Sequence, residues 1–232
     1  MSIITYSKWC DLVGPEYLKI NDRMSLELAV KRAAEVLQNS GIILYPTDTL
    51  YGFGIDVTKQ NAVEKLYAIK GRSNKKPVSL MVSSVEQIEN ITNIHPQELK
   101  RVLTKVFPGK ITALLENRLK KSLAVFEYLQ YPLKKIGFRI PESSFCNLLN
   151  DLVENPVSTT SANISGQPNI TKIENLPDSL KNQLDLIIDA GDAEDIRGST
   201  IIDFSEKPYK IVREGAVCLE KLKSVLLNEE LE

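Results

Sequence analysis

Residues 45–82 read YPTDTLYGFGIDVTKQNAVEKLYAIKGRSNKKPVSLMV. The apolar residues Ile42–Tyr45 lead into this stretch, and their brevity, β-branched side chains and flanking Gly and Pro predict a buried strand. A turn rich in hydroxyl groups and glycine follows. An amphipathic helix is predicted over Asn61–Ile69, because its apolar side chains recur at helical spacing. The stretch therefore predicts a strand, a polar turn and a helix in succession.

A cluster of cations ends this predicted helix. It reads KGRSNKKP at residues 70–77, and a second strand is predicted over Val78–Val82. A related pattern of hydroxyl groups and glycine, TTSANISGQPNIT, occupies residues 159–171. A strand end that offers hydroxyl groups close to clustered positive charge predicts a site for a polyanion.

The composition is that of an ordinary globular protein. The chain has 232 residues, 43% hydrophobic and 25% charged, which predicts one well-packed domain. Its net charge of −1 provides no global basic field for nucleic acid. No apolar run approaches the roughly 18 residues that span a membrane, and the start lacks the layout of a signal peptide. A cytoplasmic protein without membrane contact is predicted.

Cysteine and histidine are too sparse to suggest a metal site. Cys10, Cys146 and Cys218 are far apart and form no CxxC pair, which disfavours a disulfide framework or bound zinc. The one histidine, His95, precedes Pro96 and is predicted to cap a helix or lie on the surface. No dedicated metal site is predicted.

The remaining elements predict a mixed α/β fold. Strands gather late in the chain, so strict alternation of strands and helices is absent, and neither a repeat nor a linker divides the chain. The predicted helices are Ser25–Ser40, Val85–Ile91, Pro96–Phe107, Phe145–Val153 and Leu219–Leu227, and the predicted strands are Ile111–Glu116, Ile136–Ile140, Pro156–Thr159, Leu184–Asp189, Thr200–Phe204 and Lys210–Arg213.

A series of short motifs resembles one known family. The motifs, in order, are PTDT-x-YG-x-G (46–54), KGR (70–72), FPG-x-x-T (107–112), FRIP (138–141), SAN-x-SG-x-P-x-x-T (161–171), GST-x-x-D (198–203) and IVREGAV (211–217). Together they resemble the YrdC family of threonylcarbamoyl-AMP synthases over about Ser25 to Lys221. Each motif is weak alone, and the specificity lies in their order and spacing.

The resemblance implies a fold and a division of the chain. A single YrdC-like α/β domain is expected at 25–221, with a twisted mixed sheet curved around a large open cavity and helices outside. Residues 1–24 would form an N-terminal extension and 222–232 the end of a helix and a tail. Some relatives carry a further C-terminal domain, which a sequence ending at Glu232 is not expected to contain.

The resemblance also implies a reaction. These synthases are nucleotidyltransferases that combine L-threonine, bicarbonate or CO2, and ATP into threonylcarbamoyl-adenylate and pyrophosphate. Mg2+ would accompany ATP. The product would pass to a tRNA threonylcarbamoyl transferase that makes N6-threonylcarbamoyladenosine, so contact with tRNA would be indirect.

The cations of the KGR motif have two interpretations. From the residues alone, Lys70 and Arg72 are somewhat more consistent with a solvated basic helix end than with a phosphate site. Gly71 between them favours close approach of a ligand. The resemblance assigns both cations to the ATP phosphates, makes Lys76 a plausible phosphate contact and leaves Lys75 solvated.

The SAN motif would ordinarily form only a turn. By resemblance, Lys70, Arg72, Ser161 and Asn163 together surround the ATP phosphates and the reacting carbamate. Two further residues, Thr171 and Arg213, would contact the nucleotide.

A third group would bind L-threonine. Thr47 and Thr49 lie two apart on extended chain and face the same way, whereas Asp48 faces the other way and is predicted to stabilise the turn. Arg139 lies in an apolar strand and needs an anionic partner. From the residues, an internal ion pair and a substrate carboxylate are equally good partners, and the resemblance favours the substrate. By resemblance, Thr49, Ser161 and Ser199 complete the threonine site.

One departure and three alternatives remain open. Many relatives have His where this chain has Met81, which leaves the threonine contacts there open. An RNA-binding module would use the local KGRSNKK patch. A carbamoyltransferase of the hydrogenase-maturation type would need zinc-finger cysteines, which are absent from this sequence. An inactive paralogue would be expected to lose the KGR and SAN motifs, and both are intact.

Overall fold

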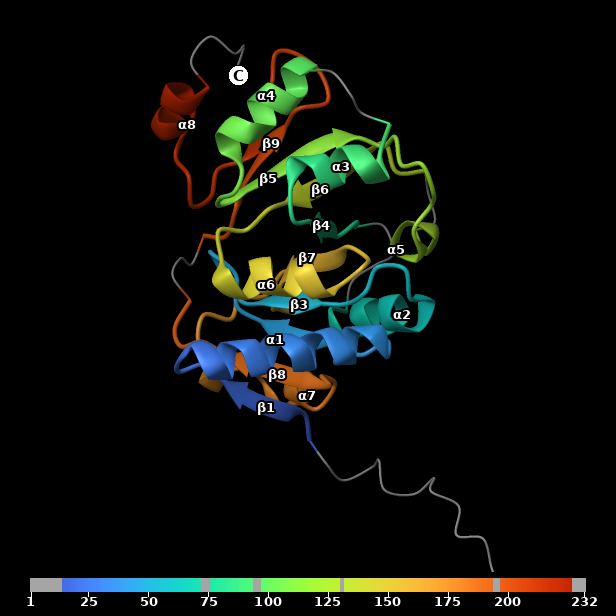
Figure 1. Cartoon of the computed structure of the whole chain (residues 1–232), viewed down its shortest axis with the longest axis vertical. Coiled ribbons are helices and arrows are strands. Elements are labelled where there is room, and N and C mark those ends of the chain that lie inside the picture. Colours follow the sequence, from blue (N-terminus) through green and yellow to red (C-terminus); the bar gives the residue numbers. More distant parts are fainter. Residues whose placement is uncertain (1–13, 72–75, 94–96, 130–131, 194–196, 227–232) are drawn as a thin grey trace, which may run out of the picture.

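The computed structural model describes residues 14–71, 76–93, 97–129, 132–193 and 197–226 (Figure 1). These residues form one ten-stranded sheet in the order β1-β8-β2-β3-β7-β4-β6-β5-β9-β10. The strands are β1 (Glu16–Lys19), β2 (Ile43–Tyr45), β3 (Gly52–Gly54), β4 (Ser79–Met81), β5 (Ile111–Glu116), β6 (Lys135–Arg139), β7 (Val157–Ser161), β8 (Leu186–Asp189), β9 (Thr200–Asp203) and β10 (Lys210–Arg213).

The sheet is mixed. Strand β8 pairs in parallel with β1 and β2, and the pairs β4–β6 and β5–β9 are also parallel. The other neighbours are antiparallel, including the β2–β3–β7–β4 run at the centre. The prediction of a mixed α/β fold built on one twisted sheet is confirmed.

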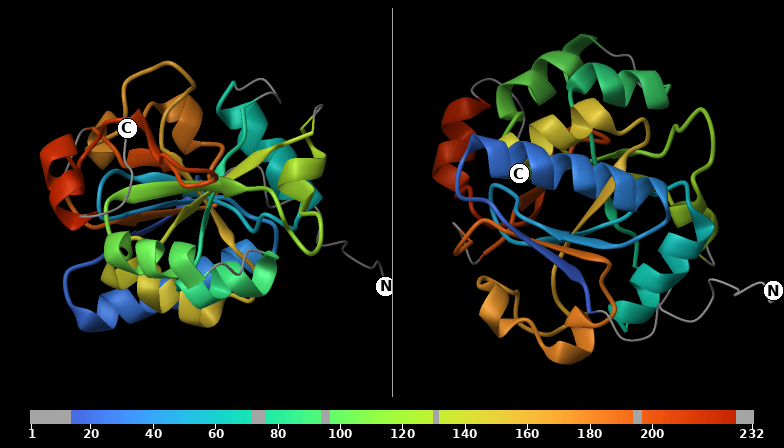
Figure 2. Two further views of the ribbon diagram at one scale, coloured as in Figure 1. Left: turned by 90° about the horizontal axis from the view of Figure 1, so that it is seen from above. Right: turned by 60° about the horizontal axis from the view of Figure 1, so that its bottom comes forward.

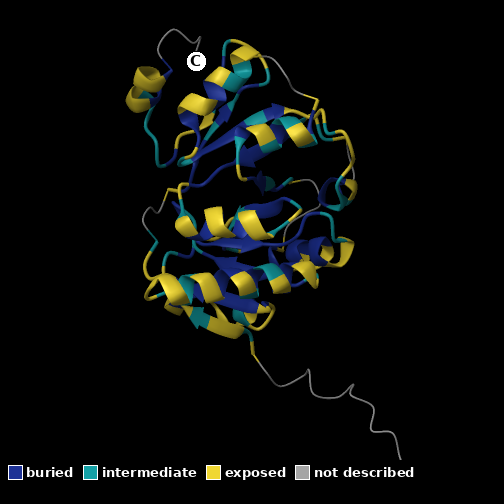
Figure 3. Cartoon of the chain, viewed as in Figure 1, coloured by how far each residue is buried: buried dark blue, intermediate teal, exposed yellow. Residues whose placement is uncertain are grey.

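Helices cover both faces of this sheet (Figure 2). They are α1 (Arg23–Gln38), α2 (Gln60–Ile69), α3 (Val85–Ile91), α4 (Gln97–Val106), α5 (Ala124–Glu127), α6 (Ser144–Leu152), α7 (Asp178–Lys181) and α8 (Leu219–Val225), with a 3-10 turn at Ile173–Asn175. In the run 42–45 that contains β2, Ile43 and Tyr45 pack with α1 and α6, whereas Ile42 and Leu44 pack in the cluster that contains α2. Both faces of β2 are therefore buried, like most of the central part of the sheet in Figure 3, which explains the uninterrupted apolar run at 42–45.

Capping explains where α1 begins. The Asp22 side chain accepts a hydrogen bond from the Ser25 amide at 2.8 Å, and the Ser25 hydroxyl accepts one from the Asp22 amide at 3.0 Å. This capping box makes Asp22 the N-cap and Ser25 the third helical residue. The helix therefore starts two residues before the predicted position, Ser25.

Two strands lie where no strand was predicted. The GFG segment of β3 is too short and too rich in glycine for strand propensity to indicate it. Its glycines are needed because a Cβ at Gly54 would lie 2.8 Å from Ile43 Cγ1 and 2.9 Å from Tyr45 Cε1. Residues Glu16–Lys19, within the predicted N-terminal extension, form β1 at the sheet edge. Strand β1 pairs with the distant β8, and β3 pairs with the nearby β2 and the distant β7, so both depend on pairing more than on their own propensity.

Candidate functional site

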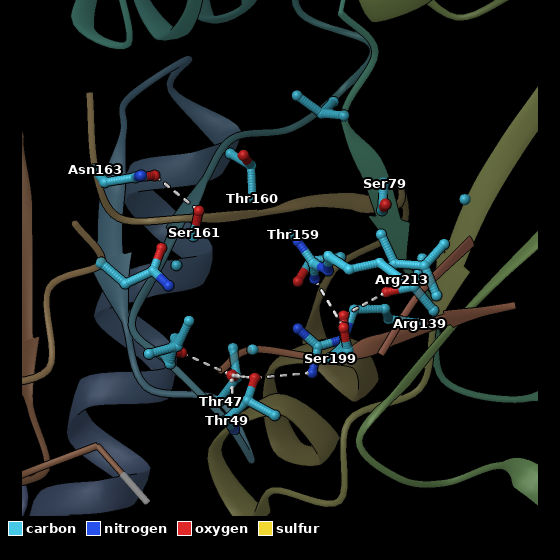
Figure 4. Close-up of a pocket in the computed structure, with 18 of the residues that line it drawn as sticks. Thr47, Thr49, Ser79, Arg139, Thr159, Thr160, Ser161, Asn163, Ser199 and Arg213 are labelled. Carbon is cyan, nitrogen blue, oxygen red and sulfur yellow. Dashed lines mark hydrogen bonds between the residues drawn. The ribbon is translucent and has the colours of Figure 1, made fainter. Parts of the chain in front are cut away.

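A cavity of about 500 Å³ opens on the sheet and on the loops at its strand ends. It is lined from strands β3, β4, β5, β6, β7, β9 and β10 (Figure 4). Among the described lining residues six are cationic and none is acidic. The six are Lys70, Lys76, Lys135, Arg139, Arg197 and Arg213. A concave site with clustered positive charge concentrates anionic ligands.

Lys70 connects the KGR motif with the SAN motif. It follows α2 and is only 2% exposed. Its Nζ donates to the carbonyl oxygens of Ser161 at 2.6 Å and Asn163 at 3.0 Å, and lies 5.5 Å from the centre of the Phe53 ring. The interpretation of Lys70 as a solvated helix end is therefore wrong, because carbonyl oxygens at the end of β7 and in the loop after it hold its ammonium group.

The loop after β7 is bound from several directions. The Ser161 hydroxyl donates to Asn163 Oδ1 at 2.7 Å, and Asn163 Nδ2 donates to the Gln167 carbonyl at 2.6 Å. The Ser165 amide donates to the Lys70 carbonyl at 3.0 Å. These bonds fix the loop against the end of α2, so that Lys70, Ser161 and Asn163 line one wall of the cavity.

Two threonine hydroxyls of the PTDT turn also line the cavity. The hydroxyl oxygens of Thr47 and Thr49 are 3.2 Å apart, which confirms that the two side chains face the same way. The Thr47 hydroxyl also donates to the Leu50 carbonyl at 2.7 Å. Thr49 is buried and receives a bond of 3.2 Å from Arg139 Nη2. Thr49 and Arg139 therefore lie together on the cavity wall.

Arg139 has the internal partner that the sequence left open. Its Nη2 donates to Asp48 Oδ1 at 2.6 Å, and both side chains are buried. The other Asp48 oxygen accepts the Glu142 amide at 3.1 Å. The prediction that Asp48 merely stabilises its own turn is wrong, since its oxygens bind the end of β6 instead. Arg139 Nε is buried and has no hydrogen-bond partner among the described residues, and such a donor needs an acceptor from a ligand or water.

Ser199 and Arg213 meet on the far wall. The Ser199 hydroxyl lies 2.7 Å from the Thr112 hydroxyl, and the Ser199 carbonyl accepts from Arg213 Nη2 at 2.7 Å. Burial, together with the positive charge of Arg139, lowers the pKa of Arg213 below its ordinary value. The two guanidinium groups therefore repel one another, and an anionic ligand bound beside them would relieve this repulsion.

Residues 35–215 match a family model named Sua5_yciO_yrdC and described as "Telomere recombination". The chain belongs to the Sua5/YciO/YrdC family. It is 29% identical over 209 residues to a threonylcarbamoyl-AMP synthase of Pyrococcus abyssi. The aligned region covers 90% of this chain and 60% of the relative. Identity to the Homo sapiens synthase is 31%, over 85% of this chain and 71% of that one.

A solved member of the family has a closely similar fold. The P. abyssi Sua5 structure complexed with L-threonine superposes with a TM-score of 0.79 at 27% identity, covering 94% of this chain and 62% of that chain. This chain spans about 60% of the length of the P. abyssi and Bacillus subtilis relatives.

Most of the site residues predicted from the Sua5/YciO/YrdC motifs line the cavity. These residues are Thr49, Lys70, Lys76, Arg139, Ser161, Asn163, Ser199 and Arg213. Arg72, along with Lys75, lies outside the described residues. Thr171 is not among the lining residues, and its carbonyl accepts the Ala193 amide at 2.7 Å. Its contact with the nucleotide stays a prediction.

Met81 and Cys146 are buried and lie outside the cavity lining. Met81 is fully buried with its Sδ 3.8 Å from the Tyr45 hydroxyl, and it does not line the cavity. Burial raises the pKa of the Cys146 thiol to about 12, which leaves it unreactive at neutral pH. Cys10 and His95 lie outside the described residues.

Several residues that line the cavity have no role in the site predicted from the sequence. On β6, Lys135 alternates with Gly137 and Arg139, and side chains two apart on a strand share a face. That periodicity could have indicated Lys135 once Arg139 was assigned. Thr112 closes the FPG-x-x-T motif, but its contact with Ser199 joins two strands distant in sequence. Ser79, Thr159 and Thr160 carried no signal beyond being polar residues in short strands.

None of the described helices combines the length and apolar character needed to cross a bilayer. Among the described residues, no group of three or more His, Cys, Asp or Glu side chains is arranged to hold a metal ion.

Proposed function

We propose that this chain is a threonylcarbamoyl-AMP synthase, which converts L-threonine, bicarbonate or CO2, and ATP into threonylcarbamoyl-adenylate and pyrophosphate. The observation that carries the proposal is the cavity with six cations and no acid among its described lining residues, built from the motifs of this family. Relatives bearing this name in archaea and mammals support the same activity.

The amino acid would lie beside Arg139. The Nε of this side chain is buried and no described residue accepts its hydrogen bond, so a carboxylate there would satisfy it. The hydroxyls of Thr49, Ser161 and Ser199 line the same cavity and provide donors and acceptors for the amine and hydroxyl groups of L-threonine. The relative solved with L-threonine supports this choice of substrate.

The nucleotide would lie along the cationic wall. Lys70 and Arg213 are held by backbone carbonyl oxygens, so their charges are preorganised for the phosphates, and Lys76 lies on the same cavity. Arg72 and Thr171 stay assigned to the nucleotide as predictions. Because the described lining offers no carboxylate for a metal ion, Mg2+ would enter bound to the ATP phosphates as part of the substrate.

The chemistry then requires mainly proximity and charge. The amine of L-threonine forms a carbamate by adding to CO2 with loss of a proton, or by condensing with bicarbonate with loss of water. A carbamate oxygen then attacks the α-phosphorus of ATP. The bond from the α-phosphorus to the bridging oxygen breaks, and pyrophosphate leaves with the bonding electron pair. Lys70, Ser161 and Asn163 would hold the reacting groups together, and the cations would stabilise the charge on pyrophosphate.

The product is a reactive mixed anhydride and has to be consumed by an acceptor. We propose that a tRNA threonylcarbamoyl transferase takes it to form N6-threonylcarbamoyladenosine in tRNA, with tRNA bound by that partner. The cytoplasm, which holds ATP and tRNA, is the compartment in which this proposal places the reaction.

The test is pyrophosphate release with MgATP and bicarbonate, with and without L-threonine. Release should depend on threonine. Lys70→Met should lower kcat/KM about 10- to 100-fold, since hydrogen bonds to charged groups contribute about 1.5–3 kcal/mol. Lys65→Met, on the exposed face of α2, should retain wild-type activity.

A negative result has a clear meaning. Folded wild-type protein that releases no pyrophosphate in response to L-threonine would exclude the synthase. Salt-sensitive RNA binding by the same inactive protein would support the RNA-binding alternative, and inactivity without RNA binding would support the inactive paralogue.

A further inference from the structure

Asp48 is a buried carboxylate that contacts the cavity only through another residue. It is 2% exposed and is absent from the described cavity lining. Its partner Arg139 does line the cavity, at 2.6 Å from Asp48 Oδ1. A ligand in the cavity would therefore meet the guanidinium of Arg139 and not the carboxylate of Asp48.

We infer that Asp48 is a positioning residue for the carboxylate of the amino-acid substrate and acts by fixing Arg139. This inference rests on the proposed function, because it needs L-threonine as the ligand of Arg139. It assigns Asp48 a role in substrate binding that its place in the PTDT turn did not suggest.

The hydrogen bonds of Arg139 support this role. Its Nη2 donates to Asp48 Oδ1 and to the Thr49 hydroxyl at 3.2 Å, so both Nη2 hydrogens are used within the protein. Its Nε is buried and has no hydrogen-bond partner within the described part of the chain. One edge of the guanidinium is thus held by the protein, and a donor remains for a ligand acceptor.

Asp48 is itself held from a second direction. Its Oδ2 accepts the Glu142 amide at 3.1 Å, just after β6 ends. Because Arg139 is the last residue of β6, the carboxylate binds both the side chain of Arg139 and the backbone that follows it. An amide in place of the carboxylate has one acceptor oxygen and can keep only one of these bonds.

Charge supplies a second reason for Asp48. Arg139 lies close enough to Arg213 for the two positive charges to influence one another. A negative charge at 2.6 Å offsets this repulsion before a substrate arrives. Arg139 can therefore remain on the cavity wall in the free enzyme, and less reorganisation is needed when an anion binds.

The experiment compares two ligands on Asp48→Asn. Calorimetric titration with L-threonine should show affinity reduced about tenfold or more, because the charged anchor of Arg139 is lost. Competition with L-threoninamide, which lacks the carboxylate, should show a change of less than about twofold, and ATP affinity should be unchanged. A purely structural defect would weaken both ligands alike.

Asp56→Asn is the matched control. Asp56 is also a buried carboxylate with both oxygens bonded, to Thr58 and to Asn155, but it lies outside this cavity. This variant should bind L-threonine as the wild type does. Equal losses for L-threonine and L-threoninamide, or wild-type affinity of Asp48→Asn for L-threonine, would overturn the inference.

A second comparison avoids dependence on the folding of one variant. In an Arg139→Gln background, adding Asp48→Asn removes both charges of the buried pair and should leave L-threonine affinity unchanged. A further loss in the double variant would show that Asp48 acts without Arg139. If wild-type protein itself fails to bind L-threonine, the proposed function fails, which is a different result from either of these.

Discussion

At the scale of single residues, hydroxyl groups supply most of the cavity's uncharged polarity. The Thr112 and Ser199 hydroxyls are 2.7 Å apart and both residues are buried. In such a pair one hydroxyl donates to the other, and only the accepting hydroxyl keeps a hydrogen that it can donate elsewhere. The pair therefore determines what Ser199 can offer to a substrate.

Thr112→Val tests this pair, since valine keeps the shape of threonine without its hydroxyl. We expect KM for L-threonine to rise about 5- to 10-fold and stability to fall by about 1 kcal/mol, because a buried polar group loses its partner. Steady-state kinetics and urea unfolding measure the two effects. Thr112→Ser retains the hydroxyl and should recover KM, and a high KM in that variant would argue against the hydroxyl pair.

At the scale of elements, a charge pair ties β6 to β9 across the intervening β5. Lys135 Nζ lies 2.5 Å from Asp203 Oδ2, and β5 pairs with both strands. Burial raises the pKa of Asp203, but hydrogen bonds from Lys135 and Ser205 outweigh it, so the net pKa is lowered. Folding therefore favours the ionised form of Asp203. The pair stabilises the sheet at pH values at which that carboxylate is ionised.

The pH dependence of Asp203→Asn follows from this direction. A lowered pKa gives stability that is present above the ordinary Asp value of about 3.9 and is lost as pH falls through the folded value. The variant should be less stable than wild type at pH ~6 by under about 1 kcal/mol, because the Lys135 side chain is 36% exposed. Urea unfolding should show the difference shrinking below pH ~4. A constant difference at every pH would contradict the ionic origin.

At the scale of the whole molecule, the cavity collects residues from Thr47 to Arg213. Strands on both sides of the central β7 contribute to it, so a ligand would contact both halves of the sheet. A ligand that binds only the folded chain stabilises the fold as a whole. Clustered cations should also make that stabilisation depend on salt.

Thermal unfolding with MgATP tests this linkage. At a concentration 100 times its Kd, MgATP should add about 2.7 kcal/mol to the free energy of unfolding, seen as a raised Tm. Added salt above ~0.5 M should reduce the effect by screening the phosphate contacts. Adenosine, which lacks phosphates, should stabilise much less. Equal stabilisation by adenosine and ATP would mean that the cations do not bind the phosphates.

The sequence by itself determined the elements with strong periodicity and the family. The predicted helix at 25–40 and the strand Ile42–Tyr45 are found because their apolar patterns are local properties of the chain. The motifs likewise indicated eight of the residues that line the cavity, from Thr49 to Arg213. Such signals are readable without knowing what packs against them.

Only the tertiary structure decided which polar groups become partners. Asp48 and Arg139 are 91 residues apart in the sequence, and no local pattern distinguishes an ion pair from a turn and a free cation. The same holds for Lys70, whose ammonium is held by carbonyl oxygens from the distant loop after β7. Strand β3 formed for a related reason, since its short glycine-rich segment gains stability from β2 and β7 and not from its own propensity. Partners of this kind depend on distances in space, which the chain acquires only when the sheet assembles.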